Sequence, residues 1–223
     1  MRVNECFYSL QGEGICSGVP TVFIRMQGCN TSCLYCDTTY AQDPDGGSDT
    51  SIDAIIQEVR ELVPCYDSWV CITGGEPLYQ ESELEKLVLG LKEEDYKVSI
   101  ETNGSYEPPK WWSMVDSWVP DIKCPSSGVC GLSKDKWLLM GRMRDQIKFV
   151  VGIPEDLDFV VEKLRHGVLC TVLVSPVFTI SESDGNFSWD PSWAQIVWEF
   201  CRKMGVQFSL QTHKVVFGNK VGV

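Results

Sequence analysis

Three cysteines stand close together in the first quarter of the chain, at spacings that suit metal chemistry. Cys29, Cys33 and Cys36 lie in the run Gln27–Asp37. Cysteine thiolates at short spacings in one loop are the usual ligands of iron–sulfur clusters. A four-iron cluster held by only three thiolates keeps one iron open to a small molecule that offers an amine and a carboxylate. S-adenosylmethionine carries both groups, so the triplet predicts a [4Fe–4S] cluster together with this cofactor.

Zinc is the other metal that such a triplet could hold. A structural zinc site needs four ligands, and the two histidines, His166 and His213, lie far from the triplet in the sequence. A non-catalytic zinc or iron–sulfur protein therefore stays open as an alternative. Cys124 and Cys130 are too few to hold a second cluster. Other cysteines stand in apolar runs, where a thiol packs as a small hydrophobic group: Cys71, Cys170 and Cys201.

Short apolar segments alternate with amphipathic ones along the chain. Strand-forming residues bounded by turn residues predict the following strands: Thr21–Arg25, Trp69–Thr73, Lys97–Glu101, Ser117–Lys123, Gln146–Val151, Leu169–Ser175 and Val206–Leu210. Apolar residues at helical spacing predict the following helices: Ser51–Val63, Ser82–Lys92, Lys134–Arg142, Asp156–Arg165 and Ser192–Met204. This alternation favours a parallel sheet with helical crossovers. We therefore expect an α/β fold, an open partial (β/α) barrel of six or seven mostly parallel strands, in a single domain over residues 1–223.

A glycine-rich turn follows the second predicted strand. The segment is Gly74-Gly75-Glu76-Pro77. Two glycines let a ligand approach the backbone closely, and the carboxylate of Glu76 can pair with an ammonium group. A cysteine triplet after the first strand with this turn after the second resembles the radical S-adenosylmethionine superfamily. The resemblance implies that the turn binds the amino group of the cofactor's methionine.

Further segments resemble one branch of that superfamily, the 7-carboxy-7-deazaguanine synthases. They are Phe7–Gly14, Gly18–Pro20, Cys36–Thr38, Glu101–Gly104, Pro120–Lys123 and Gln211–Lys214. The resemblance runs from Asn4 to the last residues, and the N-terminal half is its specific part. It implies a lyase that converts 6-carboxy-5,6,7,8-tetrahydropterin to 7-carboxy-7-deazaguanine, with release of ammonia, on the route to queuosine and related 7-deazapurines.

The resemblance also implies roles for individual residues, with the radical generated on the cofactor and no catalytic side chain assigned. Leu10, Gln11, Gly12 and Thr73 would contact the pterin, and Arg25 would pair with its carboxylate. Thr38 would ligate a magnesium ion bound to that carboxylate. The implied S-adenosylmethionine contacts are Gly75, Glu76, Asn103, Lys123, Cys124, Pro125, Ser175 and Gln211.

Simpler structural roles stay open for several of these residues. Arg25 could form a structural ion pair, and Gln11 could belong to a polar turn. Thr38 could end the cysteine loop, and Asn103 before Gly104 also suits a turn. His213 is given no catalytic role.

Charge and composition limit the partners. The net charge of −12 repels phosphate backbones, so nucleic acid is not expected to bind, and an anionic substrate must meet a local Arg or Lys. No apolar run reaches the ~20 residues that span a membrane, and the N-terminus has no apolar signal region, so we expect a cytoplasmic protein.

The family resemblance adds two partners, a flavodoxin-like or other electron donor and a second copy in a homodimer. The rival enzyme class is an activase that places a glycyl radical on a partner enzyme. Such activases share the triplet and the small size, and they consume S-adenosylmethionine where a synthase regenerates it.

Overall fold

Two sheets side by side form the wall of the molecule. The computed structural model describes residues 1–63, 69–139, 141–180, 187–218 and 220–223. The larger sheet has the strand order β3-β1-β2-β4-β5-β6 and the smaller one β11-β8-β7. Parallel pairing runs through these strands: β2 (Pro20–Met26), β4 (Trp69–Gly74), β5 (Lys97–Thr102), β6 (Ser117–Pro120), β7 (Gln146–Val151), β8 (Thr171–Pro176) and β11 (Gln207–Phe208).

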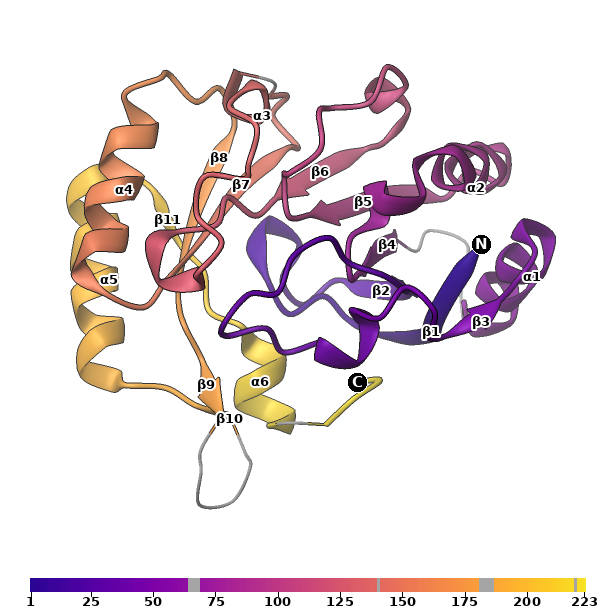
Figure 1. Ribbon diagram of the computed structural model, residues 1–223, viewed down its shortest axis with the longest axis horizontal. Coiled ribbons are helices and arrows are strands. Elements are labelled where there is room, and N and C mark those ends of the chain that lie inside the picture. Colours follow the sequence, from indigo (N-terminus) through magenta and orange to yellow (C-terminus); the bar gives the residue numbers. More distant parts are fainter. Residues whose placement is uncertain (64–68, 140, 181–186, 219) are drawn as a thin grey trace.

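One backbone contact joins the sheets into a continuous curved surface. Asp121, just after β6, forms an isolated parallel bridge with Lys148 of β7, and the N–H of Ile122 donates to the Lys148 carbonyl at 2.8 Å. Among the described strands, the wall therefore runs from β3 to β11 without closing on itself (Figure 1). The predicted open partial barrel is confirmed.

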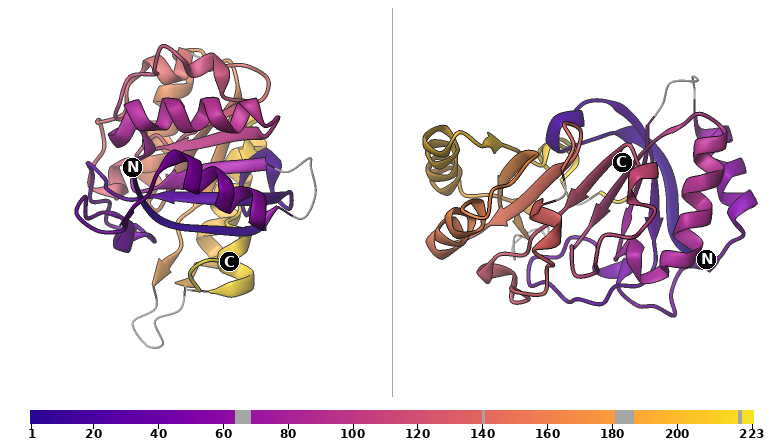
Figure 2. Two further views of the ribbon diagram at one scale, coloured as in Figure 1. Left: turned by 90° about the vertical axis from the view of Figure 1, so that its right-hand side faces the viewer. Right: turned by 90° about the horizontal axis from the view of Figure 1, so that it is seen from above.

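Helices cover the outer side of this wall (Figure 2), except the last one, which contributes residues to the cavity. Their bounds are α1 (Ile52–Leu62), α2 (Glu81–Glu93), α3 (Lys136–Leu139), α4 (Pro154–Leu164), α5 (Pro191–Met204) and α6 (Thr212–Phe217). The helix α1 begins where the Ser51 side chain accepts the N–H of Ala54, and it buries Ile55, Ile56 and Val59 against the core. Side chains buried between wall and helices, such as Ile24 and Ile72, form one hydrophobic core. No described helix is long and apolar enough to cross a membrane.

Strands outside the parallel set were not predicted. β1 (Arg2–Leu10) pairs antiparallel with β2, and the short strands β3 (Ser48–Asp49), β9 (Thr179–Ile180) and β10 (Phe187–Ser188) complete the set. β1 was missed because most of its residues are only half-buried and it lacks a long apolar run.

Element bounds also need correction at several places. The helix predicted over Lys134–Arg142 is only the four residues of α3 in the described chain, with residue 140 outside the described ranges. The strand predicted over Ser117–Lys123 ends at Pro120, and that over Val206–Leu210 shortens to β11. The helix α6 was not predicted, because six residues are too few to show a helical period.

Candidate active site

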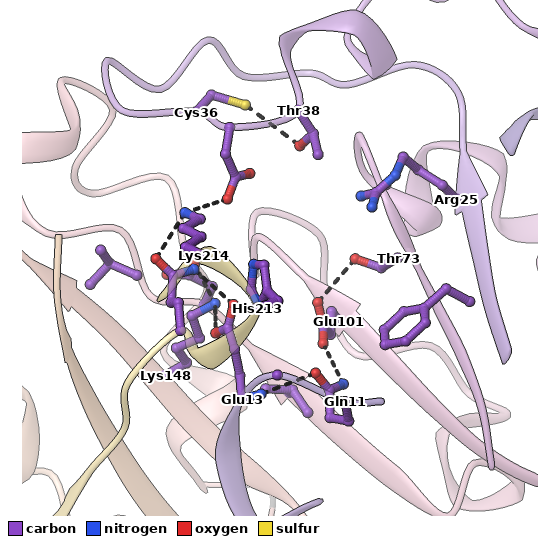
Figure 3. Close-up of a pocket in the computed structure, with 18 of the residues that line it drawn as sticks. Gln11, Glu13, Arg25, Cys36, Thr38, Thr73, Glu101, Lys148, His213 and Lys214 are labelled. Atoms are coloured by element: carbon purple, nitrogen blue, oxygen red, sulfur yellow. Dashed lines mark hydrogen bonds and ion pairs between the residues drawn. The ribbon is translucent and has the colours of Figure 1, made fainter. Parts of the chain in front are cut away.

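A cavity of about 250 Å³ lies at the carboxyl ends of the parallel strands. Loops after several strands contribute to it, and so do β1 and α6 (Figure 3). Most of the predicted site residues line it: Leu10, Gln11, Gly12, Arg25, Cys29, Cys33, Cys36, Thr38, Thr73, Gly75, Asn103, Lys123 and Gln211. Four predicted cofactor contacts are absent from its lining: Glu76, Cys124, Pro125 and Ser175. The sheet thus gathers residues that are far apart in the sequence.

The cysteine loop follows β2 and carries all three predicted cluster ligands as free thiols. The hydroxyl of Thr31 lies 3.3 Å from the sulfur of Cys29 and 3.8 Å from that of Cys33. Backbone hydrogen bonds hold the loop at both sides: the N–H of Cys29 donates to Gln42, and that of Leu34 to Ser127. The thiols therefore face the cavity on a fixed backbone.

This donor set fits a cluster better than a single ion. A structural zinc site needs four ligands around one ion, and no group of three or more His, Cys, Asp or Glu side chains in the described ranges is arranged in that way. The thiolates of a cuboidal iron–sulfur cluster bind different irons, so they need not meet at one point. Cys124 is buried and Cys130 is exposed, and neither lines the cavity.

The glycine-rich turn has a structural role that its sequence did not reveal. A Cβ atom on Gly75 would lie 2.1 Å from the Gly28 carbonyl oxygen, so only glycine lets β4 end against the cysteine loop. The Glu76 carboxylate is fully buried and accepts from Thr102 Oγ1 at 2.7 Å and from the Asn103 N–H at 2.6 Å. Burial raises the pKa of Glu76, although the hydrogen bonds from these donors act to lower it. Glu76 thus braces the end of β5, and its pairing with a ligand ammonium stays a prediction.

A buried acceptor in the cavity has no donor. Asp121 Oδ1 is buried and has no hydrogen-bond partner among the described residues, whereas Oδ2 accepts from Lys123 Nζ at 2.9 Å. Leaving such an oxygen unpaired costs about 1–3 kcal/mol. A bound ligand with a hydroxyl or ammonium group would satisfy it, and S-adenosylmethionine has both.

Buried charges of alternating sign cross the cavity. Lys148 Nζ lies 2.5 Å from Glu13 Oε2, and Gln211 Nε2 donates to Glu13 Oε1 at 2.7 Å. Burial opposes ionisation of Glu13, but Lys148 and His213 outweigh it and lower its pKa to about 2. Lys214 continues the network, 2.5 Å from Asp37 Oδ2 and donating to Gln211. These two pairs place lysine side chains beside carboxylates inside an acidic protein.

The sequence did give signals for this network, although it did not predict it. Lys148 is a charged residue inside an apolar predicted strand, and Glu13 and Asp37 stand within the quoted family segments. Gly12 has a steric role beside them, because a Cβ there would lie 2.2 Å from His213 Nδ1. His213 is therefore a cavity residue, packed against the Gly12 backbone from α6.

Glu101 of β5 connects two of the predicted substrate contacts. The sequence analysis did not assign Glu101 to the site. Gln11 Nε2 donates to Glu101 Oε1 at 3.1 Å, and Thr73 Oγ1 donates to Glu101 Oε2 at 3.0 Å. The three side chains come from the end of β1, from β4 and from β5 and lie together in Figure 3. They offer a planar ligand both donors and acceptors.

Arg25 on β2 forms a structural ion pair, and its pairing with a substrate carboxylate stays a prediction. Its Nε donates to Glu5 Oε1 at 2.7 Å, so an ion pair is present. Its guanidinium end nevertheless points toward the open centre of the cavity in Figure 3. Thr38 also lines the cavity, with its hydroxyl 3.8 Å from Cys36 Sγ.

Comparison with known proteins agrees with this geometry. The Radical SAM superfamily model matches residues 23–116, which contain the cysteine loop and β4. QueE from Escherichia coli has a similar solved structure, with a TM-score of 0.70 at 24% identity over 95% of this chain and 94% of that one. The family model thus assigns residues 23–116 to the Radical SAM superfamily, a class that uses a [4Fe–4S] cluster and S-adenosylmethionine, and the solved structure shows the same fold.

Sequence relatives define the branch. The 7-carboxy-7-deazaguanine synthase of Methanospirillum hungatei is 41% identical over 180 residues, covering 80% of this chain and 73% of the relative. That of Koribacter versatilis is 36% identical over 227 residues, covering 97% of each. The chain belongs to the 7-carboxy-7-deazaguanine synthase family.

Replacing any cysteine of the triplet tests the cluster assignment. We expect Cys29→Ala, Cys33→Ala and Cys36→Ala, purified without oxygen, each to lose the brown colour and the bound iron, because each thiolate of the triplet would hold a different iron of the cluster. Cys170→Ala, at a partly buried cysteine beside the core, should keep the cluster and lose only thermal stability. Iron analysis and the visible spectrum measure both, and a triplet variant with full iron content would contradict the assignment.

Proposed function

We propose that this chain converts 6-carboxy-5,6,7,8-tetrahydropterin to 7-carboxy-7-deazaguanine with release of ammonia, in the biosynthesis of queuosine and related 7-deazapurines. The observation that carries the proposal is the placing of the Arg25 guanidinium in the same cavity as three free thiols. Since the chain has a net charge of −12, a carboxylated substrate needs such a local cation. The planar guanidinium can donate two parallel hydrogen bonds to one carboxylate.

The side chains divide between the two ligands. Gln11, Thr73 and the backbone around Leu10 and Gly12 bind the pterin, with Glu101 fixing the first two. The S-adenosylmethionine contacts that line the cavity are Gly75, Asn103, Lys123 and Gln211. When bound, the cluster and S-adenosylmethionine supply a radical that removes a hydrogen atom from the substrate. The chain's own residues orient the two ligands and exclude water.

A magnesium ion at Thr38 completes the proposal for the carboxylate. Magnesium keeps several waters and takes few protein oxygens, so one hydroxyl and a substrate carboxylate would suffice. Thr38 and Arg25 line the same cavity, which supports a shared role. A flavodoxin-like or other electron donor, a homodimer and a cytoplasmic location are part of the proposal. The free thiols of all described cysteines are consistent with the last.

Product analysis tests the proposed reaction. The cluster-loaded protein is incubated without oxygen with S-adenosylmethionine, a reductant and the carboxylated tetrahydropterin. We expect mass spectrometry to detect 7-carboxy-7-deazaguanine, with an equal amount of ammonia, and neither in Cys33→Ala. Cleavage of S-adenosylmethionine with the pterin left intact would contradict the proposal and favour the activase class.

Carboxylate recognition gives a second prediction. Removing one member of a desolvated charge pair costs about 2–5 kcal/mol, or roughly 30-fold to several thousandfold in affinity. We expect Arg25→Ala to weaken substrate binding within that range with its iron content intact, and Arg25→Lys to recover only part, because lysine lacks the planar fork.

Magnesium titration completes this test. We expect magnesium to raise the activity of the unmodified chain, and Thr38→Ala to weaken that response while it retains the cluster. Full affinity in Arg25→Ala, or an unchanged magnesium response in Thr38→Ala, would show that the carboxylate is held elsewhere.

A further inference from the structure

Glu5 on β1 lies directly opposite Arg25 on β2. The antiparallel register pairs these two residues, and Glu5 Oε1 accepts from Arg25 Nε at 2.7 Å. Both side chains are mostly buried, with 21% and 15% of their surface exposed. Glu5 occupies the Nε atom of the guanidinium. The two terminal nitrogens are therefore left to donate a pair of hydrogen bonds to a ligand carboxylate.

Two aromatic rings flank the same guanidinium. Its central carbon lies 5.7 Å from the ring centre of Phe7 and 5.8 Å from that of Tyr40. Tyr40 also donates its hydroxyl to Glu5 Oε1 at 3.2 Å. Glu5 is therefore itself held in place.

These contacts restrict a side chain that is otherwise mobile. A free arginine carries about 2 kcal/mol of rotamer entropy, which a ligand must overcome if the side chain is not already fixed. The carboxylate of Asp37, in the loop after Cys36, also interacts with the guanidinium through its charge. Among the residues that the structure describes, Glu5 is the one that accepts from Arg25 Nε, so it determines which edge of the guanidinium remains for a ligand.

We propose that Glu5, supported by Tyr40, is a positioning residue that aims the terminal nitrogens of Arg25 at the carboxylate of the substrate. This inference rests on the proposed function, since it requires Arg25 to bind that carboxylate. It assigns to β1 a part in substrate selection: the strand carries both Glu5 and Phe7 on the face that meets Arg25. Neither residue was singled out as a ligand contact from the sequence.

A pair of ligands isolates the role of Glu5. Binding of 6-carboxypterin and of unsubstituted pterin, which are stable oxidised rings differing only in the carboxylate, is measured by titration calorimetry on cluster-loaded protein. We expect Glu5→Ala to weaken 6-carboxypterin about 10- to 100-fold, the effect of losing a hydrogen bond to a charged group, and to leave pterin unchanged. Tyr40→Phe, which keeps the ring, should weaken 6-carboxypterin about 2- to 10-fold.

Conservative variants separate positioning from charge. Glu5→Gln keeps an acceptor for Arg25 Nε and should recover most of the affinity lost in Glu5→Ala. Glu107→Gln removes the same charge at an exposed position outside the cavity lining and should change neither ligand. In turnover, Glu5→Ala should raise KM far more than it lowers kcat.

The outcomes distinguish this inference from the proposed function. If Arg25→Ala weakens 6-carboxypterin but Glu5→Ala does not, the positioning role is wrong and carboxylate recognition by Arg25 stands. If Glu5→Ala weakens both ligands equally, Glu5 acts only on the general structure of the cavity, and the inference is again overturned. If Arg25→Ala changes neither ligand, carboxylate recognition itself fails.

Discussion

The cations of the cavity are held by carboxylates, and this pairing is the constraint on which the rest of the site depends. A buried charge without a partner loses its hydration and is strongly destabilising, whereas a paired one is tolerated. An acidic chain can therefore keep buried cationic side chains in a cavity by placing an anion beside them. Four ion pairs have their cation in the cavity lining: Arg25–Glu5, Lys123–Asp121, Lys148–Glu13 and Lys214–Asp37.

Two of these four pairs also connect segments that are not joined by backbone hydrogen bonds of a sheet. Lys148 belongs to β7 and Glu13 to the loop after β1, so their contact joins the smaller sheet to the larger one across the cavity. Lys214 and Asp37 connect α6 to the cysteine loop. The charges thus hold the walls of the cavity in position while they provide the local cations that a carboxylated ligand requires. Arg25 differs from the lysines because its planar fork has a second edge beyond the one that Glu5 occupies.

Local sequence patterns predicted the parts of this structure whose signals are local. The parallel strands contain β-branched apolar residues, and the cysteine triplet lies within one loop, so both were visible without coordinates. β1 was not, because half-buried positions such as Asn4 and Glu5 interrupt any apolar run. Because β1 was not predicted, Glu5 was not recognised as the ion-pair partner of Arg25. Glu101 and Lys148 were missed because only the pairing of strands brings them to the cavity. Glu76 was predicted as a ligand contact from its motif, and the sequence did not show that its carboxylate also bonds the end of β5.

The ratio of S-adenosylmethionine consumed to product formed tests most directly whether this cavity is that of a synthase. Both the synthases and the activases need the cysteine triplet, so cluster content alone cannot separate them. The ratio is measured over many turnovers with the carboxylated tetrahydropterin, by quantifying methionine and 7-carboxy-7-deazaguanine in the same sample. We expect far less than one methionine per product molecule, because S-adenosylmethionine is regenerated in each cycle. One methionine released for every product molecule would contradict this account.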